Sequence, residues 1–302
     1  MRRSAIVLAV LLAAGVAHAD ELAFLGPRGT YSEQAADQYS NRVRGFDKTV
    51  PMDTITAVWR VVQDGRIQRG IIPAVATTSG FPAESTRVLL GALDPGVRIV
   101  GEQTIPIDND LMVKPGTTLE RIKTVLSHPN ALGEAGHWLH ANLPHAAWQE
   151  TKSTAAAAEI VSTGDGTTAA VAGPFAAKYY GLDVLAEKIQ DNQQNATSFW
   201  AIVRAGAPME DTPDRIAVNL EAPAGSAAFS AVVSELASAG LQVVNVNSVP
   251  LPGELLGYRY MIVLAAGKQL VLGPIEGLIR ARAAASGGTA LVIGAWRTGH
   301  SG

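Results

Sequence analysis

The sequence predicts an α/β protein in which a larger domain of strand–turn–helix units is followed by a smaller α+β domain. Over residues 22–182, short apolar strands alternate with helical stretches, a pattern typical of parallel sheets covered by helices. Over residues 215–296 the order changes to strand, helix, strand, strand, helix, strand. The 302 residues correspond to roughly two domains of about 150 residues each.

The composition excludes several classes of protein. Apolar residues make up 47% of the chain and charged residues 17%, as in globular rather than disordered proteins. With no cysteine, the chain has neither a disulfide scaffold nor a thiolate metal site nor a cysteine nucleophile. The formal net charge of −3 gives no reason to expect a nucleic-acid partner, because duplex binders present a basic face.

The first nineteen residues have the pattern of a secretory signal peptide. Arg2 and Arg3 precede an apolar stretch over residues 5–16, which is too short to span a bilayer comfortably. The segment 17–19 reads Ala-His-Ala, so cleavage is expected after Ala19. The alternative is an uncleaved amphipathic start. We therefore expect a periplasmic or secreted protein that does not contact the membrane after cleavage.

The first strand–helix unit begins with an apolar strand over residues 22–25 and a turn over 26–29. Thr30 and Glu33 then have the spacing of a capping box, which predicts a helix that continues to about Tyr39. Further along the chain, a helix is expected over residues 54–62 and a brief buried strand over 70–73.

The rest of the larger domain alternates in the same way. Pro129 suits a first helical turn, so a helix is expected from there to about Asn142. Ser153 can cap an alanine-rich helix. The other expected elements are extended chain over 98–107 and 111–113, strands over 124–126 and 169–172, and helices over 154–161 and 176–180.

A polar segment with two prolines, residues 206–213, is the expected linker between a domain at 20–207 and a domain at 213–302. The second domain has strands expected over 215–220, 243–249, 259–264 and 289–296, and helices over 226–239 and 275–285. The resulting βαββαβ order is that of the ferredoxin-like fold.

Four loops of the larger domain carry hydroxyl side chains and follow strands. They span residues 26–32, 77–80, 127–129 and 151–154. Ligands of α/β proteins bind at the carboxyl ends of parallel strands, where helix N-termini offer free N–H groups and a positive dipole end. Together the loops favour a site for a small, carboxylated anion. The alternative is that each hydroxyl only caps its own helix.

Other chemistries have little support in the sequence. His137 and His140 have no third metal ligand spaced with them, so no metal site is predicted. Residues 26–29 lack the spacing of either nucleotide-binding loop. Ser79 and Ser226 lie outside the motif of a serine hydrolase.

Several segments, in order, resemble the prephenate dehydratase family. Residues 24–36 read Phe-Leu-Gly-Pro-Arg-Gly-Thr-Tyr-Ser-Glu-Gln-Ala-Ala, and residues 127–132 read Ser-His-Pro-Asn-Ala-Leu. Ser-Thr-Ala at 153–155 and Asn-Ala-Thr-Ser-Phe at 195–199 follow, the latter where the family has Asn-x-Thr-Arg-Phe. The smaller domain resembles the ACT regulatory domain of this family. The resemblance covers nearly all of residues 22–302.

The resemblance implies a two-lobed, periplasmic-binding-protein-like domain with its site in the cleft between the lobes. The family converts prephenate to phenylpyruvate with loss of carbon dioxide and water on the route to phenylalanine, without a cofactor, and commonly as a homodimer. Thr197 takes the role of proton donor or hydroxyl-orienting group. The expected substrate-binding residues are Arg28, Thr30, Ser32, Thr77, Thr78, Ser127, His128, Ser153, Thr154 and Phe199.

The chain departs from the family pattern at defined positions. Ser198 replaces an arginine that can bind a carboxylate bidentately, so Arg28 or Lys114 is expected to supply the missing charge. The Glu and Asn of the family's Pro-Ile-Glu-Asn motif are absent from residues 73–78, and Gly173 replaces a usual serine. The predicted effector positions, where two ACT motifs are altered, are Gly225, Ser226, Asn247 and Ser248.

Three functions follow from these departures. The first is an exported prephenate dehydratase in which Thr197 is active. The second is a prephenate decarboxylase that releases carbon dioxide without dehydration, although the retention of Thr197 argues against it. The third is a non-catalytic exported binder of a carboxylated metabolite.

Overall fold

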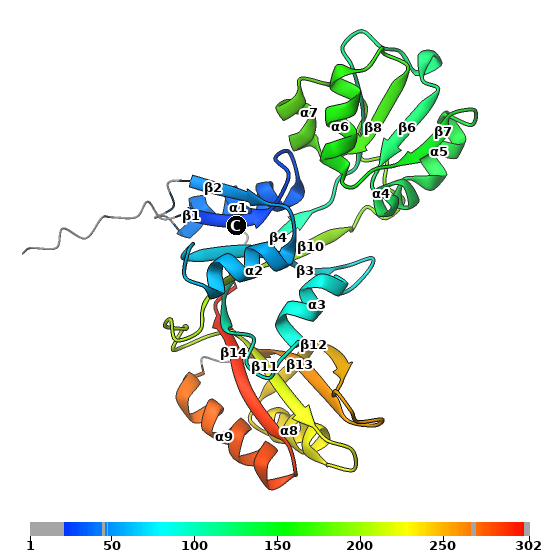
Figure 1. Cartoon of the computed structure of the whole chain (residues 1–302). Coiled ribbons are helices and arrows are strands. Elements are labelled where there is room, and N and C mark those ends of the chain that lie inside the picture. The colour runs from blue at the N-terminus through cyan, green and yellow to red at the C-terminus, as the bar shows by residue number, and fades with distance from the viewer. Residues whose placement is uncertain (1–20, 44–45, 47, 267–269, 299–302) are drawn as a thin grey trace, which may run out of the picture.

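The computed structural model describes residues 21–43, 46, 48–266 and 270–298. The predicted signal peptide lies outside these residues. The chain forms three units, which we call lobe 1, lobe 2 and the C-terminal domain, and lobe 1 lies between the other two (Figure 1). Among the described residues, no helix has the length and apolar character needed to cross a membrane.

Lobe 1 is built from the described residues between 21 and 106 together with a strand that returns from lobe 2. Its elements are β1 (Glu21–Leu25), α1 (Tyr31–Val43), β2 (Lys48–Met52), α2 (Ile55–Gln63), β3 (Arg69–Ala76), α3 (Ala83–Leu90), β4 (Val97–Pro106) and β10 (Ala196–Arg204). The predicted Thr30 cap is confirmed, since its hydroxyl accepts from the Glu33 N–H at 3.3 Å. The structure also shows that Thr54 caps α2.

Lobe 2 lies between β4 and β10 in the sequence. Its elements are β5 (Asp110–Val113), η1 (Leu119–Arg121), β6 (Thr124–Ser127), α4 (Pro129–Glu134), α5 (Gly136–Asn142), β7 (Ala147–Glu150), α6 (Thr154–Thr163), β8 (Thr168–Ala172), α7 (Pro174–Tyr180) and β9 (Asp183–Ala186). The helix expected up to Asn142 is present but is interrupted at Ala135. The predicted cap of α6 is confirmed, since the Ser153 hydroxyl accepts from the Ala156 N–H at 3.0 Å.

The two sheets are mixed, whereas the repeated strand–helix units predicted parallel sheets. β1 pairs in parallel with β2 and β3, but β10 runs antiparallel between β3 and β4. In lobe 2 the order is β7-β6-β8-β5-β9, with β5 antiparallel to both neighbours. The physical reason is the same in both lobes: the chain leaves lobe 1 through β4 and returns through β10, so the crossing segments run in opposite directions. The two-lobed α/β architecture is confirmed.

The C-terminal domain has the predicted βαββαβ order. Its elements are β11 (Arg215–Ala222), α8 (Ala228–Ser238), β12 (Leu241–Pro250), β13 (Tyr258–Ala266), α9 (Leu272–Ala285) and β14 (Thr289–Trp296). The strands pair antiparallel in the order β12-β13-β11-β14, which is the ferredoxin-like arrangement. This prediction is confirmed.

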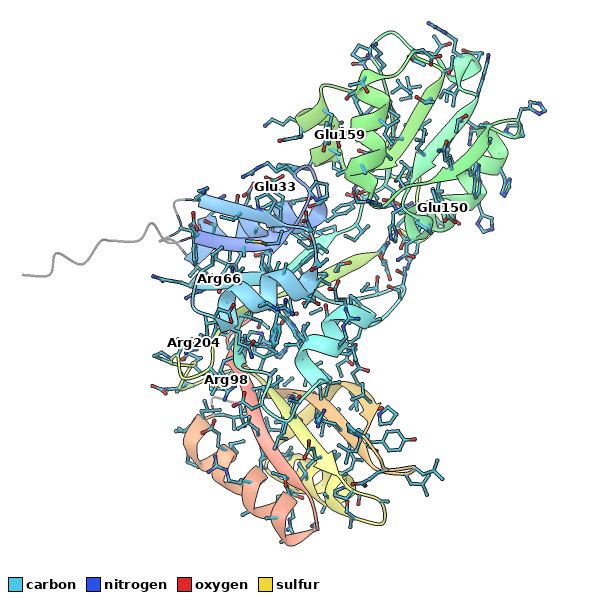
Figure 2. The ribbon with its side chains drawn as sticks, viewed as in Figure 1. Glu33, Arg66, Arg98, Glu150, Glu159 and Arg204 are labelled. Carbon is cyan, nitrogen blue, oxygen red and sulfur yellow. The ribbon has the colours of Figure 1, made fainter. Side chains whose placement is uncertain are left out.

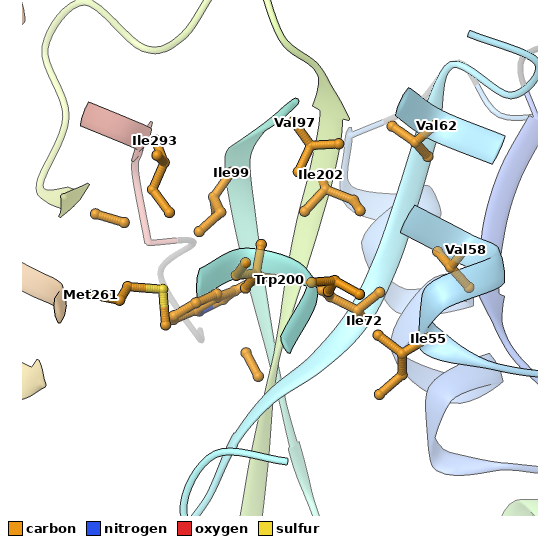
Figure 3. Packing of buried hydrophobic residues seen from close by; sticks show 14 of the residues in the cluster. Ile55, Val58, Val62, Ile72, Val97, Ile99, Trp200, Ile202, Met261 and Ile293 are labelled. Atoms are coloured by element: carbon orange, nitrogen blue, oxygen red, sulfur yellow. The ribbon is translucent and has the colours of Figure 1, made fainter. Parts of the chain in front are cut away.

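Strand β11 of the C-terminal sheet is buried on both faces. Ile216 and Val218 on one face of β11 pack with the core beneath α8 and α9, whereas Ala217 on the other face joins the core of lobe 1. Met261 and Ile293 of this domain lie beside Trp200 and Ile99 of lobe 1 in that shared core (Figure 3). Strand β14 also bridges to β4, so lobe 1 and the C-terminal domain share one nine-stranded sheet.

Polar contacts also join the two units at the end of α3. Arg259 of β13 donates to the Leu90 carbonyl at 2.6 Å and pairs with Glu221 of β11. Asn219 of β11 is fully buried and donates to the Leu89 carbonyl at 2.9 Å. These side chains satisfy carbonyl groups that a helix leaves unpaired at its C-terminus. The C-terminal domain is therefore docked on lobe 1 by a buried polar interface as well as by apolar packing.

Candidate functional site

A cleft of about 980 Å³ lies between the lobes. Loops after β1, β2 and β3 line it from lobe 1, residues after β6 and β7 line it from lobe 2, and β10 contributes at the crossing. Because these loops follow the carboxyl ends of strands, the cleft is at the place where α/β proteins bind ligands.

Nine of the predicted site residues line this cleft. They are Arg28, Thr30, Ser32, Thr78, His128, Ser153, Thr154, Thr197 and Phe199. Residues from four separate loops and one strand are thus brought to one site, as the sequence led us to expect from its hydroxyl-bearing loops. Their roles in binding or catalysis stay predictions.

Two predicted binding residues, Ser127 and Thr77, do not line the cleft. Ser127 is fully buried and its hydroxyl donates to the Val171 carbonyl, so it links β6 to β8. The Thr77 hydroxyl donates to Asn195 Oδ1 and accepts from the Ala196 N–H, both at 3.0 Å. Both hydroxyls therefore hold the strands and loops that carry the site.

Thr197 lies near the start of β10, between Ala76 of β3 and Ile105 of β4. Its side chain is half-buried and lines the cleft. The Thr78 hydroxyl is bonded to Glu134 and the Ser153 hydroxyl caps α6. The Thr197 hydroxyl, in contrast, forms no hydrogen bond with another described residue, so it is available to a ligand.

Ser198 faces away from the cleft. It lines a second pocket of about 280 Å³ between lobe 1 and the C-terminal domain. There its hydroxyl donates to Glu102, whose other oxygen accepts from the Trp296 indole at 3.2 Å. Successive side chains on a strand point to opposite faces, so a residue next to Thr197 cannot share its side. Ser198 therefore does not contribute its side chain to the cleft.

The two cations expected to replace the family's arginine are not equivalent. Arg28 lines the cleft, but it is paired with Glu33 and donates to the Thr49 carbonyl at 2.9 Å. Glu33 lies on the side of lobe 1 that faces lobe 2 (Figure 2). Lys114 is outside the cleft lining, and its ammonium donates to the Gly164 carbonyl at 2.8 Å. The suggestion of Lys114 is therefore wrong.

The sequence reasoning missed several polar residues of the cleft. They are Tyr31, Asp53, Ser79, Asn109, Asn130, Glu134, Lys152 and Asn195. A signal was present for Glu134, which is one helical turn after Asn130 and so shares its face of α4. A signal was also present for Lys152, a cation directly before the helix cap Ser153. Asn109 and Asn195 lie on the two crossing segments, whose meeting depends on the tertiary structure.

Hydrogen bonds join the lobes around the cleft. Glu134 of lobe 2 accepts from the Thr78 hydroxyl of lobe 1 at 3.0 Å and from Asn109 Nδ2 at 2.9 Å. The Tyr180 hydroxyl of lobe 2 donates to the Arg28 carbonyl at 3.2 Å. The lobes are thus held close together on both sides of the cleft.

The end of the cleft nearest the two segments that cross between the lobes, which we call the hinge, carries acidic side chains. The Tyr31 hydroxyl donates to the Asp108 carbonyl at 2.5 Å. Burial, followed by the negative charges of Asp110, Asp108 and Glu134, raises the pKa of Tyr31 well above its ordinary value. Burial likewise raises the pKa of Asp110. Tyr31 therefore stays protonated and acts as a hydrogen-bond donor.

Close packing against Tyr31 explains why residue 173 is a glycine. A Cβ atom there would lie 2.7 Å from Tyr31 Cζ, although the backbone of Gly173 is in an ordinary extended conformation. Gly173→Ala is therefore expected to lower the free energy of unfolding by about 1–3 kcal/mol, because it overpacks the contact between the lobes. Chemical denaturation measures this loss, and Tyr31→Leu should reduce it in the double variant.

Gly277→Ala is the matched control for that substitution. Gly277 lies within α9, and an added Cβ would meet no atom within 4 Å. It is expected to stabilise the protein by about 0.5–1 kcal/mol, as alanine does in a helix interior. Equal stability of wild type and Gly173→Ala would show that the Tyr31 ring moves aside without cost.

The predicted effector residues lie in the C-terminal domain. Gly225 has a φ angle of +78° before α8, and the Ser226 hydroxyl is buried without a hydrogen-bond partner among the described residues. Asn247 donates to the Thr86 hydroxyl of α3 at 2.7 Å and accepts from the Ser248 N–H. Asn247 is thus a contact between the C-terminal domain and lobe 1, and effector binding at these positions stays a prediction.

Metal binding has no candidate in the part of the chain that the structure describes. No group of three or more His, Cys, Asp or Glu side chains there could hold a metal ion.

Comparison with known proteins gives consistent matches. The family model described as prephenate dehydratase matches residues 22–207. A prephenate dehydratase of Mycolicibacterium gilvum is 30% identical over 294 residues, which cover 93% of this chain and 92% of the relative. Bifunctional chorismate mutase/prephenate dehydratases also match, and the chain spans 48% to 65% of the length of three of them.

Solved structures match over most of the chain. The prephenate dehydratase of Arthrobacter aurescens in complex with L-Phe has a TM-score of 0.79 at 25% identity, covering 92% of this chain and 89% of that chain. A protein described as GqqA, a novel type of quorum quenching acylase, has a TM-score of 0.78 at 22% identity, covering 93% and 98%. The second likeness shows the fold alone.

Proposed function

The chain belongs to the prephenate dehydratase family, and from this premise we propose that it is a lyase that converts prephenate to phenylpyruvate, carbon dioxide and water. The observation that carries the proposal is the placement of Thr197, which lines the cleft between the lobes with a hydroxyl that no other described residue engages. The surrounding loops supply hydroxyls, N–H groups and cations suited to a small dicarboxylate.

The reaction requires only that the protein orient the substrate and supply one proton to the departing oxygen. As carbon dioxide leaves, the electron pair of the broken carbon–carbon bond moves through a ring double bond toward the carbon that carries the hydroxyl. The carbon–oxygen bond there breaks as the oxygen receives a proton and leaves as water, and the ring is aromatic once both groups have left. Because aromatisation drives these steps, a cleft that orients the substrate and polarises the hydroxyl is sufficient.

Thr197 suits the role of hydroxyl-orienting group. An ordinary threonine does not titrate near neutral pH, so it acts through a hydrogen bond to the departing oxygen rather than as a free acid. Phe199 lines the cleft from the same strand, where it presents an apolar face to the ring. The Ser198 hydroxyl is on the opposite face of β10, where it lines the second pocket, so it takes no part in the cleft.

The test is incubation of the purified protein with prephenate. Phenylpyruvate is followed by its absorbance in alkali, and carbon dioxide release is measured in parallel. Equal amounts of both products support the proposal. Carbon dioxide without phenylpyruvate identifies a decarboxylase, whereas binding of prephenate without turnover identifies a non-catalytic binder.

Export and self-association are further parts of the proposal. Residues 1–19 support cleavage after Ala19 and a periplasmic or secreted location. Strand β12 is at the edge of the nine-stranded sheet and exposes Val243, Val244 and Val246, which supports a homodimer through the C-terminal domain. Sequencing the N-terminus of the secreted fraction and measuring its mass in solution test these two parts.

A further inference from the structure

In the described part of the chain, Arg28 and Lys152 are the two cationic residues that line the cleft. They differ in whether another side chain pairs with their charge. The guanidinium of Arg28 is paired with Glu33 and also donates to the Thr49 carbonyl. Lys152 is exposed and forms no ion pair or hydrogen bond with another residue that the structure describes. Its ammonium is therefore available to a ligand in the cleft, whereas that of Arg28 is already neutralised.

Lys152 is also placed beside free N–H groups. It follows β7 and directly precedes Ser153, the N-cap of α6. The Ser153 hydroxyl uses the Ala156 N–H, which leaves the N–H groups of Thr154 and Ala155 without acceptors among the described residues. Figure 2 shows Glu150, the last residue of β7, at the end of the strand that faces lobe 1.

Glu134, the acidic residue of lobe 2 that lines the cleft, lies toward the opposite side of the sheet from Lys152. Glu134 is bonded to Asn109, which directly precedes β5. In the order β7-β6-β8-β5, strand β7 is three places from β5, or about 14 Å at the usual strand spacing. The acidic Glu134 and the cationic Lys152 therefore line different parts of the cleft, so an anionic group is favoured beside Lys152 at the start of α6.

We propose that Lys152, together with the N-terminus of α6, binds a carboxylate of the substrate and sets its orientation in the cleft. The identity of that substrate rests on the proposed function. In prephenate the ring carboxylate and the pyruvyl group are on the ring carbon opposite the hydroxyl. A hydroxyl directed to Thr197 therefore directs both carboxylates away from β10, toward the other walls of the cleft.

The experiment compares three variants of the purified protein in the prephenate assay. Lys152→Met removes the charge and keeps the length of the side chain, and Lys152→Arg keeps the charge. Lys178→Met, at an exposed lysine of α7 outside the cleft lining, is the matched control. Thermal denaturation confirms that all three fold, which is expected because both lysines are exposed.

The expected result is a rise in KM of about 10- to 100-fold for Lys152→Met, as for the loss of one charge-assisted hydrogen bond, with a much smaller change in kcat. Lys152→Arg should recover most of the affinity, and Lys178→Met should match wild type. The KM of wild type should also rise with salt more steeply than that of Lys152→Met.

Failure of this inference differs from failure of the proposed function. Turnover with an unchanged KM in Lys152→Met overturns the role of Lys152 and leaves the dehydratase assignment standing. If wild type gives no turnover, the assignment fails, and prephenate binding is then measured by calorimetry. Weaker binding by Lys152→Met alone still supports the inference, whereas equal binding by both proteins, or none by either, overturns it.

Discussion

Thr197→Ala is expected to lower kcat for prephenate by about 100-fold or more, the usual effect of removing one hydrogen-bond donor at a reacting oxygen. The Thr197 hydroxyl lines the cleft and has no other partner among the described residues, so its loss is not compensated within the fold. Thr197→Ser keeps the hydroxyl and should retain activity within about tenfold of wild type. Steady-state kinetics of phenylpyruvate formation measure both effects.

Ser198→Ala is the matched control, because it removes a hydroxyl from the adjacent residue of the same strand. That hydroxyl bonds to Glu102 on the opposite face of β10. Its removal should change kcat only a few-fold. A similar loss in both alanine variants would show that β10 is merely disturbed, and full activity of Thr197→Ala would reject Thr197 as the group that acts on the hydroxyl.

Arg259→Met is expected to lower the free energy of unfolding by about 2–4 kcal/mol, which makes it the largest stability effect that we predict. The Arg259 side chain is only 9% exposed and joins Glu221 to the Leu90 carbonyl. Without it, a largely buried carboxylate and a helix-terminal carbonyl lose their shared donor. The partial exposure of Glu221 places the loss below that of a fully buried pair.

Chemical denaturation measures this loss, and Arg282→Met provides the same substitution at an exposed pair. Arg282 pairs with Glu235 in the same domain, and its side chain is 46% exposed. A surface pair of this kind contributes about 0–1 kcal/mol, so the control should be close to wild type. Equal, small losses in the two variants would mean that the contact between α3 and the C-terminal sheet does not stabilise the protein.

The local elements of the fold could be predicted from the sequence where the signal was itself local. The Thr30 and Ser153 caps are confirmed because a cap depends on residues within one helical turn. The βαββαβ order could likewise be predicted, because short apolar strands alternate with helical stretches in that part of the sequence. β2, β7, β9, β10 and α3 were not predicted. Three of these strands are only four or five residues long, and β2 contains a proline that weakens its strand signal.

The site could be predicted only in part, for a reason of geometry. Hydroxyls after β1, β3 and β7 reach the cleft because the ends of neighbouring strands meet at one edge of a sheet. Local sequence patterns could not show that Ser127 points into the core or that Ser198 faces the C-terminal domain. Those orientations depend on which strands pair, and a shift of one residue exchanges the two faces of a strand.

By itself, the sequence determined the order of the elements, the helix caps and the hydroxyl-bearing loops, because each depends on residues close together in the chain. Only the tertiary structure decided that β10 returns between β3 and β4, that Arg28 is neutralised by Glu33, and that Lys152 lines the cleft with no ion pair to another described residue. These facts depend on contacts between distant segments. The charge available to a ligand is set by such contacts, because a cation binds whichever acid the fold places beside it.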